Sequence, residues 1–388
     1  MRVAYITIND AHALGPKSEW SGTAYYIGRA LEQRGVEVDY LGPLQFSPLS
    51  RAITKIKRLF YQNFRNKKYL KDPDPFTLKL LSDQAAQKLK KQKYDVVLSA
   101  TVNPIAYLKC DLPIVFWADA TFANTANFYP EYSNLCKETI ENGHIMEQLS
   151  IQKCRSAVYS SEWAAQAAKN TYGADPAKVN VLEFGADLDN SYSLTEVKSL
   201  VDARPKEKCR LLFLGKDWIR KGGNKALEVT KLLNESGLKA ELLVVGCSQI
   251  SSVPLPSYVK NIGFISKLSD DGRKQLSELI ASSHFLILPT IADCSPIVFC
   301  EACSLGVPCI STDVGGIPSI IKDNINGMKF SLEAPAEQYC EFISATYSNY
   351  VTYKKLAISA FHEYEERLNW LVAGQALEKI LADASDST

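Results

Sequence analysis

The chain has 388 residues, and its 44 Lys and Arg nearly balance its 43 Asp and Glu, for a net charge of +1. This length predicts two domains that each bury a core, and the near-zero charge argues against a nucleic-acid partner. No apolar run approaches the roughly 20 residues that span a bilayer.

The N-terminal residues 3–8 form a predicted strand and not the apolar core of a signal peptide. The ten cysteines lie mostly inside apolar segments, without the spacing of a disulfide framework, so we expect a cytoplasmic protein. Four of them are close together in the sequence: Cys294, Cys300, Cys303 and Cys309. Zinc is an alternative there, but Cys300 and Cys303 flank an acid on one predicted helix, and we expect no metal.

The first half of the chain begins as a β-loop-α-β unit. A polar loop and Gly22 precede a helix predicted over residues 24–34, and a glycine ends that helix before a second strand. This order is typical of a Rossmann-like domain, although the G-x-G-x-x-G dinucleotide pattern is absent. By itself, Gly22 is explained as a residue that eases the start of the helix.

Residues 51–71 are basic and amphipathic. The cations in this segment are Arg51, Lys55, Lys57, Arg58, Arg65, Lys67, Lys68 and Lys71, and apolar side chains alternate with them. Such a helix can lie on an anionic membrane surface, which would place the protein peripherally on the inner face of the membrane. A solvated helix face is the alternative interpretation.

Two further strands are predicted at 94–99 and from Pro113 onward, and the second leads into a loop that holds Asp119 and Thr121. A carboxylate at this point can serve as a general base. It can equally cap the helix that follows. Both roles for Asp119 stay open.

The second half starts with a strand at 210–214, a loop at 215–223 and a helix at 226–235. Three cations stand in that loop: Lys216, Arg220 and Lys221. The alternative interpretation of them is solvent-facing charge. A strand at 241–245 ends at Gly246, and the next predicted strand edge, 261–266, contains Phe264 and Ile265, which are either core residues or ligand contacts.

The segment 285–289 is a short apolar run of the kind that forms a buried parallel strand. The loop after it carries Asp293, and Glu301 follows on a helix that ends at Gly306. Open α/β sheets bind ligands at the carboxyl ends of their strands. We therefore expect this loop to be functional, the alternative being acids that cap and solvate.

The segments 215–223 and 293–316 together resemble the nucleotide-sugar motifs of retaining glycosyltransferases with the GT-B fold, family 4 (group 1). The resemblance implies an α/β architecture of two facing, doubly wound, Rossmann-like domains with a nucleotide-sugar cleft between them. Residues 1–190 would form the acceptor-side domain and residues 206–360 the donor domain. Residues 361–388 would be terminal helices that return to the N-terminal domain.

In that family two acidic residues hold the donor. The resemblance implies that Asp293 contacts the sugar hydroxyls and that Glu301 accepts both ribose hydroxyls with its two oxygens. Pro296, Ile297 and Val298 would bring a helix N-terminus to the diphosphate.

The same resemblance assigns the diphosphate to two cations of the loop at 215–223. Lys216 replaces the family's arginine and lacks its bidentate fork, so Arg220 is expected to supply a guanidinium beside Lys221. Gly22 would face the diphosphate from the other domain.

The nucleobase is expected near Gly246, Phe264 and Ile265. Asp119 stands where family members carry a histidine near the reacting face of the sugar. It would orient the acceptor or take its proton.

The sequence thus predicts a retaining glycosyltransferase that moves a sugar from a nucleotide-sugar donor to a hydroxyl of a glycan, glycolipid or small molecule. Asp119, Asp293 and Lys221 are the predicted catalytic residues. No cofactor or metal is expected, because cations and helix dipoles can neutralise the phosphates. The alternatives are a nucleotide-sugar epimerase and a non-catalytic nucleotide-sugar-binding partner of another glycosyltransferase.

Overall fold

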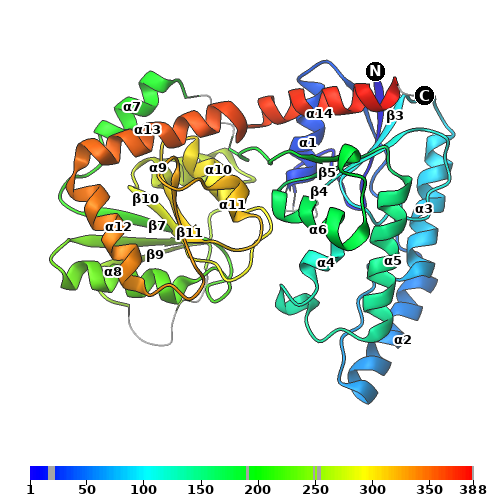
Figure 1. Cartoon of the computed structure of the whole chain (residues 1–388), viewed down its shortest axis with the longest axis horizontal. Coiled ribbons are helices and arrows are strands. Elements are labelled where there is room, and N and C mark those ends of the chain that lie inside the picture. Colours follow the sequence, from blue (N-terminus) through cyan, green and yellow to red (C-terminus); the bar gives the residue numbers. More distant parts are fainter. Residues whose placement is uncertain (16–21, 189–191, 248–249, 251–254, 387–388) are drawn as a thin grey trace. The chain divides into compact units, whose positions relative to one another are not determined.

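The computed structural model describes residues 1–15, 22–188, 192–247, 250 and 255–386 (Figure 1). The chain divides into two compact units. Unit 1 contains Met1–Glu183 and Trp370–Thr388, and unit 2 contains Phe184–Asn369. Each unit is an α/β domain built on one parallel sheet of six described strands.

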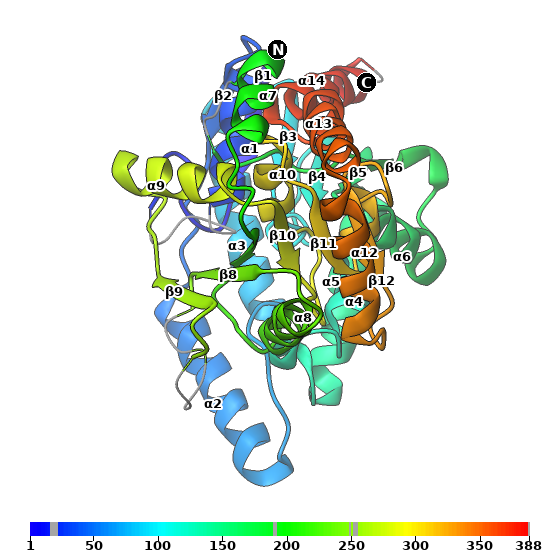
Figure 2. The ribbon, with the colours of Figure 1, turned by 90° about the vertical axis from the view of Figure 1, so that its left-hand side faces the viewer.

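The sheet of unit 1 has the strand order β2-β1-β3-β4-β5-β6. Its strands are β1 (Arg2–Ile6), β2 (Glu37–Tyr40), β3 (Val96–Ser99), β4 (Ile114–Ala118), β5 (Ser156–Tyr159) and β6 (Val179–Val181). Its α-helices are α1 (Thr23–Glu32), α2 (Pro48–Arg65), α3 (Pro75–Leu89), α4 (Phe122–Thr125), α5 (Lys137–Lys153), α6 (Glu162–Tyr172) and α14 (Trp370–Ser385). Helices α1 and α14 pack together, whereas α2 projects from the rest of the unit in both views (Figures 1 and 2).

The sheet of unit 2 has the order β12-β11-β10-β7-β8-β9. Its strands are β7 (Cys209–Leu214), β8 (Ala240–Val245), β9 (Val259–Gly263), β10 (Phe285–Leu288), β11 (Cys309–Thr312) and β12 (Gly327–Phe330). Its helices are α7 (Leu194–Asp202), α8 (Gly223–Glu235), α9 (Asp270–Ala281), α10 (Ile297–Cys303), α11 (Ile317–Ile320), α12 (Ala336–Ser348) and α13 (Tyr350–Arg367).

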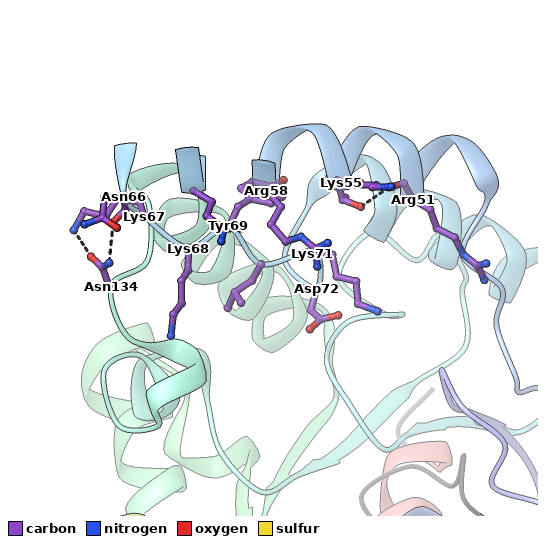
Figure 3. Close-up of a pocket in the computed structure, with 13 residues that line it drawn as sticks. Arg51, Lys55, Arg58, Asn66, Lys67, Lys68, Tyr69, Lys71, Asp72 and Asn134 are labelled. Atoms are coloured by element: carbon purple, nitrogen blue, oxygen red, sulfur yellow. Dashed lines mark hydrogen bonds between the residues drawn. The ribbon is translucent and has the colours of Figure 1, made fainter. Parts of the chain in front are cut away.

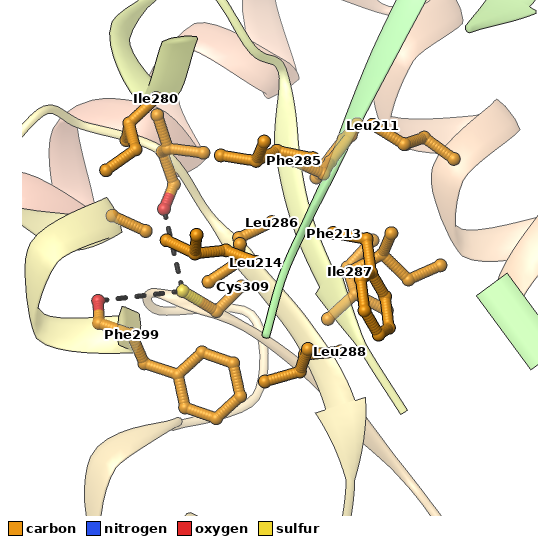
Figure 4. Close-up of a cluster of buried hydrophobic side chains, with 14 of the residues drawn as sticks. Leu211, Phe213, Leu214, Ile280, Phe285, Leu286, Ile287, Leu288, Phe299 and Cys309 are labelled. Carbon is orange, nitrogen blue, oxygen red and sulfur yellow. Dashed lines mark hydrogen bonds between the residues drawn. The ribbon is translucent and has the colours of Figure 1, made fainter. Parts of the chain in front are cut away.

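The core of unit 2 explains why its strands are so apolar. Helices lie beside the central strands β7 and β10, whose side chains are buried on both faces. Phe285 and Leu286 come from β10, while Ile280 and Phe299 come from α9 and α10 (Figure 4). Burying a side chain of this size stabilises the fold by about 1.5–3 kcal/mol. This core fixes the strand ends from which the functional loops start.

The predicted α/β class is confirmed, and the unit boundaries differ in detail from those expected. The chain enters unit 2 at Phe184 and leaves it at Asn369. Helix α13 packs on α7 and α10 inside unit 2, so only α14, of the segment 361–388, is a helix of unit 1.

Each sheet has one switch point, where the chain reverses its direction of strand addition. In unit 2 the switch lies between the neighbouring strands β7 and β10, and in unit 1 it lies between β1 and β3. Loops that leave a switch point on the carboxyl side diverge and leave a crevice for a ligand. In unit 2 these are the loops at 215–222 and 289–296, which overlap the segments 215–223 and 293–316 that the sequence singled out.

Candidate functional site

Two glycines let the loop after β7 approach the loop after β10. Gly222 has φ 78°, and a Cβ there would overlap the carbonyl oxygen of Pro289. A Cβ at Gly223 would overlap the ring of Trp218, which is buried against Phe213. Only glycine fits both positions, so the Gly-Gly pair is required by close packing.

Backbone hydrogen bonds then join the two loops. The carbonyl oxygen of Arg220 accepts from the amide of Ile291 at 2.9 Å and from the hydroxyl of Thr290 at 2.9 Å. The Arg220 guanidinium donates to the carbonyl oxygen of Ala292 at 2.7 Å. The cationic loop is therefore held rigidly beside the loop that carries the acid.

Lys221 and Asp293 form an ion pair between these loops, and both side chains are largely buried. The guanidinium of Arg220 lies 3.9 Å from the same carboxylate oxygen. The structure thus brings together three of the predicted site residues. Arg220 also lies 3.7 Å from Asp217, so two cations and two carboxylates are gathered at this end of the sheet.

Lys216 does not join that cluster. Its ammonium lies 5.3 Å from the ring centroid of Phe264, which is 63% exposed. A cation over an aromatic face is an attractive arrangement. The exposure of Phe264 contradicts the interpretation of this residue as core, because β9 ends at Gly263 and Phe264 lies beyond it.

Glu301 is fully buried on α10, and its Oε1 pairs with the ammonium of Lys267. Its Oε2 has no hydrogen-bond partner among the described residues. Burial alone would lower the pKa of Lys267, but the carboxylates of Glu301 and Asp187 raise it above its ordinary value. A buried carboxylate oxygen without a donor is costly, which sets this atom apart from the other acids of the described residues.

The remaining residues predicted to contact the donor lie in loops and at helix starts. Gly246 has φ 98° and packs against the backbone of Gly215. Ile265 packs partly on the core of unit 2. The three residues expected at a helix start do lie there, since α10 is preceded by Pro296 and begins with Ile297 and Val298. Gly22 precedes α1 with φ 119°, and the loop residues 16–21 lie outside the described residues.

Asp119 follows β4 in unit 1 and lines a cavity of about 340 Å³. The interpretation of Asp119 as the helix cap is wrong: α4 is capped by Thr121, whose hydroxyl accepts from the amide of Asn124. Glu147 lines the same cavity, accepts from the amide of Phe122 at 3.1 Å, and has its pKa raised to about 7 by burial.

All ten cysteines are free thiols. In the described part of the chain, no three His, Cys, Asp or Glu side chains are grouped so that they could hold a metal ion. No helix in that part combines the length and apolar character needed to cross a membrane.

Solved structures with the same architecture define the fold. Sucrose-phosphate synthase from Thermosynechococcus elongatus superimposes with a TM-score of 0.72 over 100% of both chains, at 14% identity. Alr3699/HepE from Anabaena, solved in complex with UDP and glucose, gives a TM-score of 0.64 over 99% of this chain and 100% of that one, also at 14% identity. The fold is therefore the GT-B fold of glycosyltransferases.

Sequence comparisons identify the family. The model described as "Glycosyltransferase Family 4" matches residues 22–190, and that described as "Glycosyl transferases group 1" matches residues 208–349. The chain belongs to the group 1 glycosyltransferases of family 4. It is also 21% identical to an Escherichia coli UDP-Gal:alpha-D-GlcNAc-diphosphoundecaprenol alpha-1,3-galactosyltransferase, over 63% of this chain and 64% of that protein. This chain thus spans less than two thirds of that relative.

Sequence reasoning missed two residues of these sites. Lys267 lies in the loop after β9, 34 positions before Glu301, and no local pattern connects the two. Glu147 stands on α5, where the polar and apolar residues follow no clear pattern. Only a buried charge in an apolar helix face could have drawn attention to it.

Proposed function

We propose that the chain transfers a hexose from a uridine-diphosphate sugar to an acceptor hydroxyl, with retention of anomeric configuration. The observation that carries the proposal is the buried Glu301, whose Oε2 lacks a donor at the ligand-binding end of the sheet. A ribose hydroxyl would supply that donor. Uridine is favoured because HepE was solved with UDP and the E. coli relative is named for UDP-Gal.

The donor diphosphate would lie against Lys221 and Arg220. These cations already converge on one carboxylate oxygen, at the start of α8. They would stabilise the negative charge that develops on the leaving nucleoside diphosphate. Asp293 would exchange part of its contact with Lys221 for the sugar hydroxyls. We propose that sugar transfer needs no metal ion. Turnover should therefore survive excess chelator, and a loss of turnover that magnesium restores would contradict metal independence.

In the transfer step the bond between the anomeric carbon and the diphosphate oxygen breaks, and a bond from that carbon to the acceptor oxygen forms. The nucleoside diphosphate leaves with the bonding electrons, and the acceptor hydroxyl loses its proton. Asp119, which lines the cavity of unit 1, would orient that hydroxyl or take the proton.

We also propose peripheral contact of α2 with the cytoplasmic face of a membrane. Three of its apolar side chains are exposed by 67%, 47% and 76%: Ile56, Phe60 and Phe64. They share one helix face with a basic flank, which is the pattern of helices that lie in a membrane interface. The ten free thiols suit a reducing compartment.

The test is turnover of UDP-glucose and UDP-galactose by the purified chain, with UDP release and product configuration followed by NMR. We expect the anomeric configuration of the product to be the same as that of the donor sugar. Lys221→Ala should lose most of the turnover.

Asp119→Asn should cut transfer roughly a hundredfold while its affinity for UDP stays within twofold of the wild type. Absence of UDP release from every donor and acceptor tried would contradict the proposal.

A further inference from the structure

A second and larger cavity, of about 730 Å³, lies beside α2 in unit 1 (Figure 3). The cavity is lined by one face of α2, by residues 66–72 that follow this helix, and by Asn134. The charged residues of this cation pocket are Arg51, Lys55, Arg58, Lys67, Lys68, Lys71 and Asp72. Six cations thus face one acid.

The pocket lining sets one acid against these cations: Asp72, whose charge interacts with that of Lys71. Among the described residues, none of the six is paired with a carboxylate. Lys67 donates to the Asn134 side chain at 2.8 Å and Lys68 to the carbonyl oxygen of Pro130 at 2.6 Å, and both acceptors are uncharged. The contrast is Lys57 on the same helix, which lies 3.0 Å from Asp74 and 2.7 Å from Glu138.

The cations of α2 thus include one that is paired with acids and a group that lines the pocket. Lys57 anchors the helix, together with Tyr61, which donates to Glu138 at 2.9 Å. Arg51, Lys55 and Arg58 recur at the spacing of one helix face and line the pocket. Like charges gathered around a cavity repel each other, so an anion that enters it gains from all of them.

The cation pocket adjoins the cavity that holds Asp119. Lys71 and Asp72 line both of them. A molecule with one end at Asp119 can therefore place its other end among the cations of α2. A neutral glycan would bring no charge to these cations, whereas a phosphate carries about −1.5 to −2 charge and accepts the bidentate fork of arginine.

We propose that the acceptor carries a phosphate or diphosphate group, and that the cation pocket holds this group while the acceptor hydroxyl lies at Asp119. The inference rests on the proposed function and specifies its acceptor class. The source of the group is either a lipid-linked headgroup or a free sugar phosphate.

The pocket is tested first by calorimetric titration with inorganic diphosphate. Arg51→Gln/Lys55→Gln should lose at least tenfold in affinity at one site. The matched control, Lys91→Gln/Lys93→Gln, removes the same charge from exposed positions of unit 1 outside the pocket and should bind like the wild type. Unchanged affinity in the pocket variant, or an equal loss in the control, would overturn the proposal.

Transfer kinetics then separate the sources. The acceptors are one sugar linked to a short alkyl chain directly, the same sugar linked through a diphosphate, and the sugar diphosphate without the chain. The wild type should show at least a tenfold lower KM for diphosphate acceptors, and the pocket variant should lose that preference. A gain without the chain assigns a free sugar phosphate, and a gain that needs it assigns a lipid headgroup.

Equal KM values for all three acceptors in the wild type would overturn the proposal. If the wild type turns over no nucleotide sugar at all, the proposed function fails, and the diphosphate titration still decides whether the pocket binds phosphate.

Discussion

Two lysine–carboxylate pairs set the charge at the loops of unit 2. Lys221 pairs with Asp293, and Lys267 pairs with Glu301. In both pairs the lysine lies against a largely buried carboxylate, and either charge buried without its partner would be strongly disfavoured. In the proposed function, Lys267 would position Glu301 and would not contact the reacting atoms.

The first prediction concerns Glu301. Glu301→Gln keeps the shape of the side chain but replaces one acceptor oxygen with an amide that donates. We expect the Kd for UDP to rise at least tenfold, about 1.4 kcal/mol, because a ribose hydroxyl loses its charged acceptor. Isothermal titration measures it, with Glu278→Gln, an exposed acid of the same unit, as the control. Equal affinity of the folded Gln variant and the wild type would remove Glu301 from the site.

A second prediction separates backbone strain from steric overlap at Gly222. Gly237 also has positive φ, at 92°, but nothing lies within 4 Å of a Cβ built there. Gly237→Ala should cost about 1–2 kcal/mol of unfolding free energy from strain alone. Gly222→Ala should cost at least about 1 kcal/mol more, since it also overlaps Pro289. Urea unfolding of both variants gives the comparison, and equal losses would refute the steric account.

The residues also show how far sequence reasoning reaches. Asp293 and Lys221 could be located because each lies in a loop after an apolar strand. Neighbouring parallel strands have their carboxyl ends on the same side of the sheet, so these two loops lie close together. Lys267 could not be located, because its contact depends on the path of the loop after β9. Lys216 contacts Phe264 and not Asp293, because nearness in sequence to Lys221 does not fix the direction of its side chain. Its contact with the donor stays a prediction.

At the scale of single elements, α2 has three distinct faces. One face anchors the helix through Lys57 and Tyr61, a second lines the cation pocket, and a third exposes Phe60 and Phe64. A helix that only faces water would gain nothing from exposed aromatic side chains such as Phe60 and Phe64. The basic and aromatic residues could be recognised in the sequence, but their separation into faces, and the pocket itself, depend on segment 66–72.

The apolar face gives a third prediction. Phe60→Ser/Phe64→Ser should lower the fraction of protein bound to phosphatidylglycerol vesicles severalfold, because it removes most of the buried apolar area. Turnover with a water-soluble acceptor should not change. Leu371→Ser, which alters a side chain 66% exposed on α14, is the control. Equal vesicle binding by the double variant and the wild type in flotation assays would argue against membrane contact through α2.

Helix α5 gives a fourth prediction, through pH. Burial raises the pKa of Glu147 to about 7, above its ordinary value of 4.5. Between these values the native state holds a proton that the unfolded chain releases, so the unfolding free energy falls as pH rises from about 4.5 to 7, by about 3 kcal/mol.

Glu147→Gln should remove that dependence while its carbonyl still accepts from the amide of Phe122. Urea unfolding, followed by tryptophan fluorescence at pH 5 and pH 8, compares the variant with the wild type. The variant should be the more stable of the two at pH 8. A parallel pH dependence in both proteins would show that Glu147 does not titrate in this range.

At the scale of the whole molecule, two sheets of the same kind place their functional loops at or near the carboxyl ends of their strands. The α/β class could be predicted because short apolar runs alternate with amphipathic helices along nearly the whole chain. The exact boundaries could not, because α13 continues the pattern of terminal helices although it packs in unit 2. Residues 43–95, where the family resemblance is weakest, contribute α2 and α3 and much of the cation pocket.

In the proposed function, the loops around Lys221, Asp293 and Glu301 bind a nucleotide sugar. A thermal-unfolding screen of the wild type against UDP-, GDP-, ADP- and CMP-sugars tests it most directly, because a ligand at a hundred times its Kd stabilises the native state by about 2.7 kcal/mol. We expect a UDP-hexose to raise the melting temperature by several degrees, and the shift to disappear in Glu301→Gln. No shift with any nucleotide sugar, or the same shift in the variant, would contradict the claim.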